Sequence, residues 1–148
     1  MTDPFVRPEE PTAAAAIAAI GDELAVFDDW MERYQFIIEL GRKLPSFPDE
    51  WADDAHRVPG CQSRVWMEET LSEGRLFLAG ISDAAIVSGL IALLLRVYSG
   101  RSPAEIVATD PVFLRDLGLL EALSTNRGNG LAAMARKIRA LAASRNAA

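Results

Sequence analysis

The spacing of apolar residues changes along the chain, and this change divides it into helical ends and an extended middle. Apolar side chains recur at positions 30, 34, 37 and 38, the spacing of one face of an α-helix. Asp29 and Glu32 have the spacing of a capping box just before this pattern. The pattern predicts an amphipathic helix that starts after Asp29 and ends at Gly41, a natural C-cap followed by two prolines.

The middle of the chain predicts a small antiparallel sheet. Residues 63–71 and 75–79 are short extended runs separated by Ser72, Glu73 and Gly74, which favours a β-hairpin. Residues 56–58 could add a short third strand, with Pro59 and Gly60 forming a type II turn after it. Cys61 would then lie at the tip of a turn.

Helices are predicted on both sides of this sheet. Thr12 can cap an Ala-rich helix that runs toward Phe27, with Gly21 as a break or kink in its middle. After the sheet, Ser82 or Asp83 can cap an apolar helix over residues 84–97, which we expect at the centre of the core. Two short helices follow the caps Ser102 and Asp110, and the second ends at Gly118. The last helix starts near Ser124.

This order of elements predicts the α+β class, with a small antiparallel sheet packed on helices. A length of 148 residues suits one domain, which we place at residues 12–143. Residues 1–11 are rich in proline and acids, so we expect a flexible tail there.

Charge and composition exclude several classes of function. The net charge is −6 and no dense Lys/Arg cluster is present, so nucleic acid is not an expected partner. The longest apolar stretch is well short of the roughly 20 residues that span a bilayer, so no membrane contact is expected. No secretory signal is visible, which predicts a cytoplasmic protein. One cysteine and one histidine are too few to complete a zinc or cluster site, so no metal is expected.

Cys61 is the main candidate for chemistry. A lone cysteine is by default a small buried apolar residue, but Gly60 and Gln62 place this one in a predicted turn, where functional groups concentrate. The chain has no second thiol to release a disulfide or persulfide. Whatever Cys61 accepts must therefore leave through another molecule, which suits a carrier. Because a free thiol has a pKa of about 8.5, a nearby group should help to form the thiolate.

Two other side chains are candidates for a supporting role. His56 precedes Cys61 by five residues and could act as a general base or an orienting group, or be an ordinary solvated loop histidine. Arg127 falls in the first turn of the last helix, where the helix dipole disfavours a cation. It is either a contact for an anion or a partner, or a frayed surface arginine.

Four segments together resemble the SufE family of sulfur-acceptor proteins. They are residues 57–66 (RVPGCQSRVW), residues 34–41 (YQFIIELG), residues 82–92 (SDAAIV and GLIA around Ser88), and Arg127 with Gly130, Leu131 and Met134. The resemblance covers residues from about 30 to 138. It implies a SufE/IscU-like fold, similar to that of iron-sulfur cluster scaffold proteins.

The same resemblance implies a function. Cys61 would accept sulfur from the persulfide of a SufS-type cysteine desulfurase, stimulate that enzyme, and pass the sulfur toward a SufBCD-type scaffold. The pyridoxal phosphate would belong to the desulfurase, and this chain would bind no cofactor. Gly60 would be a hinge next to Cys61 and Gln62, and Arg127 would organise the cysteine loop or the desulfurase interface. A Cys-dependent hydrolase, a non-catalytic interaction module and a cluster scaffold are the alternatives.

Overall fold

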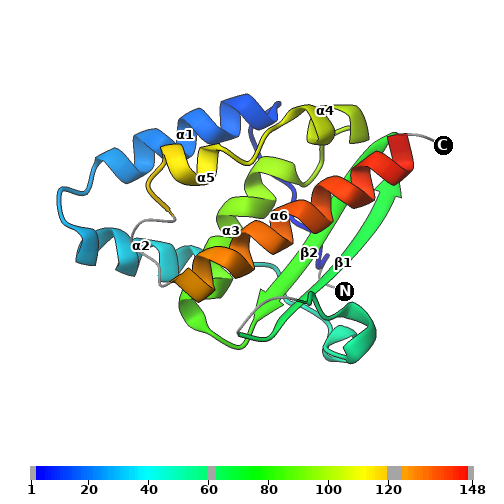
Figure 1. Cartoon of the computed structure of the whole chain (residues 1–148), viewed down its shortest axis with the longest axis horizontal. Helices are drawn as coiled ribbons and strands as arrows, with labels where there is room; N and C mark the ends of the chain where they lie inside the picture. The colour runs from blue at the N-terminus through cyan, green and yellow to red at the C-terminus, as the bar shows by residue number, and fades with distance from the viewer. Residues whose placement is uncertain (1–2, 60–62, 120–124, 147–148) are drawn as a thin grey trace.

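The computed structural model describes residues 3–59, 63–119 and 125–146, and residues 125–129 without their side chains. Along these residues a single β-hairpin is preceded and followed by helices, as Figure 1 shows. The α-helices are α1 (Ala13–Ala25), α2 (Trp30–Arg42), α3 (Ala85–Tyr98), α4 (Pro103–Ala108), α5 (Phe113–Asp116) and α6 (Thr125–Asn146). Two 3-10 turns, η1 (Asp49–Trp51) and η2 (Asp54–His56), precede strands β1 (Val65–Ser72) and β2 (Arg75–Ser82). The predicted α+β class is confirmed.

The sheet is a two-stranded antiparallel hairpin. Its register runs from Ser72 opposite Arg75 to Val65 opposite Ser82. The loop between the strands is two residues long, and both have positive φ, 52° at Glu73 and 78° at Gly74. A tight turn with two left-handed residues matches the natural twist of the strands. The expected third strand is only an isolated bridge, between Arg57 and Trp66.

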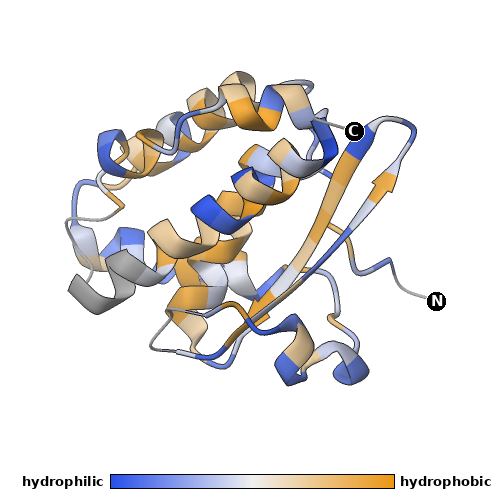
Figure 2. Cartoon of the chain, turned by 45° about the vertical axis from the view of Figure 1, so that its right-hand side comes forward, coloured by the Kyte–Doolittle hydropathy of each residue, from blue (hydrophilic) through white to orange (hydrophobic). Residues whose placement is uncertain are grey.

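Helix α3 lies at the centre of the core. It packs against α1, α2, α6 and β2, and the apolar faces of these elements turn inward around it (Figure 2). Leu93, Leu94 and Leu95 are all buried. Neither Ser82 nor Asp83 caps this helix as predicted, because its N-cap is Ala84, without a side-chain hydrogen bond.

Helices α2 and α3 approach each other closely at two glycines. A Cβ on Gly41 would lie 2.5 Å from the Gly89 nitrogen. The prediction that α2 ends at Gly41 is therefore wrong: the helix continues to Arg42, and Gly41 instead gives the backbone of α3 room to approach. Gly21 does not break α1, which is continuous from Ala13 to Ala25 with Thr12 as its cap.

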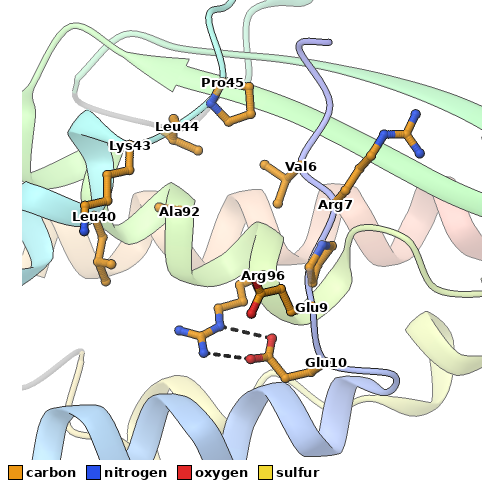
Figure 3. Close-up of a pocket in the computed structure, with 11 residues that line it drawn as sticks. Val6, Arg7, Glu9, Glu10, Leu40, Lys43, Leu44, Pro45, Ala92 and Arg96 are labelled. Carbon is orange, nitrogen blue, oxygen red and sulfur yellow. Dashed lines mark hydrogen bonds and ion pairs between the residues drawn. The ribbon is translucent and has the colours of Figure 1, made fainter.

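The N-terminal segment, residues 3–11, packs along β2 and α3, whereas the sequence suggests a flexible tail. The Val6 N–H donates to the Leu78 carbonyl at 2.8 Å, and the Ser99 hydroxyl donates to the Val6 carbonyl at 2.6 Å. Glu10 forms an ion pair with Arg96 at 2.8 Å (Figure 3). These partners are far away along the chain, so local sequence does not reveal the contacts.

A groove of about 250 Å³ separates this segment from the end of α2. Figure 3 shows Leu40 and Leu44 on one side of it and Val6 on the other. No helix among the described residues is long and apolar enough to cross a membrane.

Candidate functional site

The residues on both sides of Cys61 are held to the start of the hairpin. Gly60, Cys61 and Gln62 lie outside the described residues. Upstream, Val58 is buried and its N–H donates to the Val65 carbonyl at 2.9 Å. The segment that contains Cys61 is thus closed at its base, next to the first residue of β1.

Downstream of Cys61, Ser82 and Asp83 fix Arg64. The Arg64 N–H donates to Asp83 Oδ1 at 3.1 Å, and the Arg64 carbonyl accepts from the Ser82 hydroxyl at 2.7 Å and from the Asp83 N–H at 3.2 Å. The sequence suggested one or the other of these two side chains as a helix cap. Their contact with Arg64 follows from the hairpin register, because antiparallel pairing places the end of β2 beside the start of β1.

His56 connects the loop before Cys61 to β1. Its Nδ1 lies 2.6 Å from Asp53 Oδ1, and its Nε2 lies 2.7 Å from Glu68 Oε2. A carboxylate only accepts hydrogen bonds, so both contacts are satisfied when the imidazole is protonated and donates from both nitrogens. The hydrogen bond to Asp53 and then that to Glu68 raise the pKa of His56 above 6.5. This arrangement suits an orienting group better than a general base, which needs a free ring nitrogen.

Aromatic side chains support this histidine from the side of the loop. The Trp51 ring stacks on His56 with centroids 6.0 Å apart. Phe5, from the N-terminal segment, and Phe47 pack on Trp51 at 5.8 Å and 5.7 Å. Sequence reasoning did not include Trp51 in the site, although an aromatic residue in a polar loop indicates a packing role. The N-terminal segment is therefore connected, through Trp51, to the residue that anchors the cysteine loop.

We expect the stability given by His56 to depend on pH. Its folded pKa is raised, so its contribution is complete below the unfolded value of 6.5 and is lost as pH rises through the folded pKa. The pKa of Asp53 is lowered, chiefly by the hydrogen bond to His56, so its contribution is lost only as pH falls below 3.8. The melting temperature of His56→Gln should be below that of the native chain at about pH 5.5, and the difference should shrink by about pH 9.

Thermal unfolding followed by circular dichroism, in steps of pH, measures this difference. Asp54→Asn is a matched control, because Asp54 is an exposed acid of the same loop that makes no side-chain contact with His56. A difference between His56→Gln and the native chain that stayed constant over this range would show that His56 acts by packing alone.

Arg127 lies in the first turn of α6, as expected from the sequence. Its side chain is outside the described residues, so its supporting role stays a prediction. Among the described residues, no group of His, Asp and Glu side chains is arranged to hold a metal ion.

Comparison with known proteins identifies a matching family and similar proteins from two organisms. A family described as "SufE: Fe-S metabolism associated domain" matches residues 18–142. An uncharacterized SufE-like protein of Rhizobium etli is 40% identical over 139 residues, which cover 90% of this chain and 94% of that protein. A second uncharacterized SufE-like protein, from Rhizobium meliloti, is 38% identical over 129 residues, which cover 84% of this chain and 92% of that protein.

A solved structure has a similar fold. The solution structure of a hypothetical protein from Thermus thermophilus superposes with a TM-score of 0.74, covering 90% of this chain and 97% of that one. The sequence identity is 22%, so this likeness concerns the fold alone.

Proposed function

The chain belongs to the SufE family, which is associated with Fe-S metabolism, and from this premise we propose that it is a sulfur carrier. Cys61 accepts a sulfane sulfur from a SufS-type cysteine desulfurase, stimulates that enzyme, and delivers the sulfur to a SufBCD-type scaffold. The observation that carries the proposal is that the described residues hold both ends of the segment around the chain's single cysteine, through Val58 and Arg64.

The transfer is a displacement at sulfur. The Cys61 thiolate attacks the terminal sulfur of the desulfurase persulfide, a new S–S bond forms on Cys61, and the desulfurase cysteine leaves as a thiolate. No net oxidation occurs. Because this chain has one cysteine, the persulfide is resolved only by a nucleophile of the next protein. The pyridoxal phosphate that releases sulfur from free cysteine is the desulfurase's own.

The described residues support an anchoring role for the hairpin. Ser82 and Asp83 hold Arg64 two residues after Gln62, and His56 is held by Glu68 of β1. Fixed ends limit the conformations that the intervening residues can adopt, which lowers the entropy cost of presenting the thiol to a partner. Gly60 supplies the hinge, Gln62 flanks the thiol, and Arg127 organises the cysteine loop or the desulfurase interface.

The geometry of His56 argues against the Cys-dependent hydrolase. Such an enzyme needs a histidine nitrogen free to take the thiol proton. Both ring nitrogens of His56, the only histidine in the chain, are instead within 2.7 Å of a carboxylate. A carrier has no such need, because its donor already holds the sulfur in a reactive state.

A sulfur-transfer assay tests the proposal. The protein is incubated with the desulfurase of the same organism and free cysteine, and its mass is then measured without reductant. We expect one added sulfur on Cys61, none on Cys61→Ser, and loss of desulfurase stimulation in that variant. Ser63→Ala, a change of similar size two residues away, should be labelled like the native chain. Undiminished stimulation by Cys61→Ser would falsify the proposal.

A further inference from the structure

The connection between α1 and α2 exposes large apolar side chains. Val26 is 75% exposed, Met31 65% and Trp30 38%. The apolar spacing predicts Trp30 on the core-facing side of α2. Trp30 is instead the exposed first residue of this helix. Figure 1 places this connection at the end of the molecule opposite the hairpin turn. Isolated exposed apolar residues are ordinary, but three within six residues form a patch.

Two aromatic side chains lie beside these residues. The rings of Phe27 and Phe36 pack with their centroids 5.0 Å apart. Together with Met31 they line an open groove of about 400 Å³ along α2. We call Val26, Phe27, Trp30, Met31 and Phe36 the α1–α2 corner. The groove gives the corner room for one or two side chains of another molecule.

Carboxylates surround the corner. Residues 22–39 contain six acids and one arginine, so this segment holds most of the net charge of −6. Asp28, Asp29, Glu32 and Glu39 are exposed, and of these Glu39 forms an ion pair with Arg42. The arginine, Arg33, lies along the edge of the corner, where its Nε donates to the Phe27 carbonyl at 3.1 Å and its guanidinium lies 5.9 Å from the centre of the Trp30 ring. An apolar centre with an acidic rim is complementary to an apolar surface with a basic rim.

We propose that the α1–α2 corner docks a cationic amphipathic helix of a partner protein. Leucine-type side chains of that helix enter the groove between Met31 and Phe36, and its lysines or arginines meet Asp28 and Glu32. Charge argues against the other occupants: the acidic rim repels both a second copy of this chain and an anionic membrane. The inference does not depend on sulfur transfer, because the corner contains no part of the Cys61 segment.

A synthetic helical peptide with leucines on one face and lysines on the other serves as the probe. Isothermal titration at low and moderate salt should show saturable binding to the native chain that weakens as salt rises. Val26→Asp/Met31→Asp should weaken binding at least about tenfold, although it adds negative charge. Val112→Asp, at an isolated apolar residue with 39% exposure, and Cys61→Ser should bind like the native chain.

The remaining outcomes overturn the proposal. Equal binding by Val26→Asp/Met31→Asp would mean that the peptide senses only negative charge. If sedimentation showed that the native chain is a dimer and that the double variant is a monomer, the corner would be assigned to a second copy. Binding to vesicles of anionic or zwitterionic lipid that this change abolishes would assign it to a membrane. Matching circular dichroism spectra of the variants exclude unfolding as the cause.

Discussion

Replacing Gly89 by alanine is expected to destabilise the protein by about 3 kcal/mol or more. A Cβ at this position would overlap the carbonyl oxygen of Ile37 and lie 2.6 Å from its Cγ2 atom. The oxygen belongs to the backbone of α2, so no side chain can rotate away, and the two helices must separate. Separation opens the core around α3, where most residues are buried. The loss is a large share of the roughly 5–15 kcal/mol that stabilises a typical domain.

The matched control for this change is Gly21→Ala. Both glycines lie inside a helix, so alanine brings the same gain in helix propensity, about 1 kcal/mol. A Cβ on Gly21 meets only Leu117 Cδ2, at 3.4 Å, an ordinary contact. We therefore expect Gly21→Ala to stabilise the protein slightly, while Gly89→Ala lowers its melting temperature by roughly 6–12 °C.

Urea unfolding of both variants gives the comparison directly. Gly41→Ala should resemble Gly89→Ala, because its Cβ would meet the α3 backbone at Ser88 and Gly89, in the same contact between the two helices. The double variant should lose less than the sum of the two, since one separation of the helices relieves both clashes. If Gly89→Ala and Gly21→Ala proved equally stable, the close approach of α2 and α3 would contribute nothing to stability.

Replacing Arg101 by methionine is expected to cost about 2–4 kcal/mol. Arg101 is only 4% exposed, and its guanidinium donates to the carbonyls of Val97 at 3.0 Å, Glu10 at 2.6 Å and Arg96 at 3.0 Å. Burial lowers the pKa of Arg101, because the buried cation loses part of its solvation. Methionine fills the space of the stem but leaves three backbone carbonyls without this donor.

The effect of Arg101→Met should extend to the N-terminal segment, because one of the three carbonyls belongs to Glu10. Limited proteolysis should cut residues 3–11 faster in this variant, and urea unfolding should show the loss of stability. Arg101→Lys should recover only part, since one ammonium does not match the planar fork of a guanidinium. Arg115→Met, at a side chain that is 70% exposed, should change the stability by less than about 0.5 kcal/mol. Equal stability of Arg101→Met and Arg115→Met would contradict the role of Arg101.

Local sequence predicts the elements whose ends depend on neighbouring residues. Thr12, Asp29 and Ser102 cap α1, α2 and α4 as expected, each through its own side chain. The hairpin turn follows from Glu73 and Gly74 in the same way. The family and the α+β class, both predicted from the sequence, are also confirmed.

Features that depend on distant residues were not predictable. Gly41 looks like a helix end, and only the position of Gly89, far along the chain, shows that it serves helix packing. In the candidate site, sequence singles out Cys61 as the only thiol. The carboxylate on the far side of His56 comes from Glu68, and its direction is set by the strand register. Periodicity identifies β1 but does not reveal which loop residue faces it.

The N-terminal segment also has a consequence for association between molecules. The outer edge of β2 is closed by Val6 at Leu78 and by Arg101 at Leu76. An uncovered strand edge offers its N–H and carbonyl groups to any other chain, which is a common start of aggregation. A chain shortened to begin at residue 18 would retain every family-matched residue and yet leave part of this edge open. The residues before α1 thus cover part of a strand edge that could otherwise pair with a second copy of the chain.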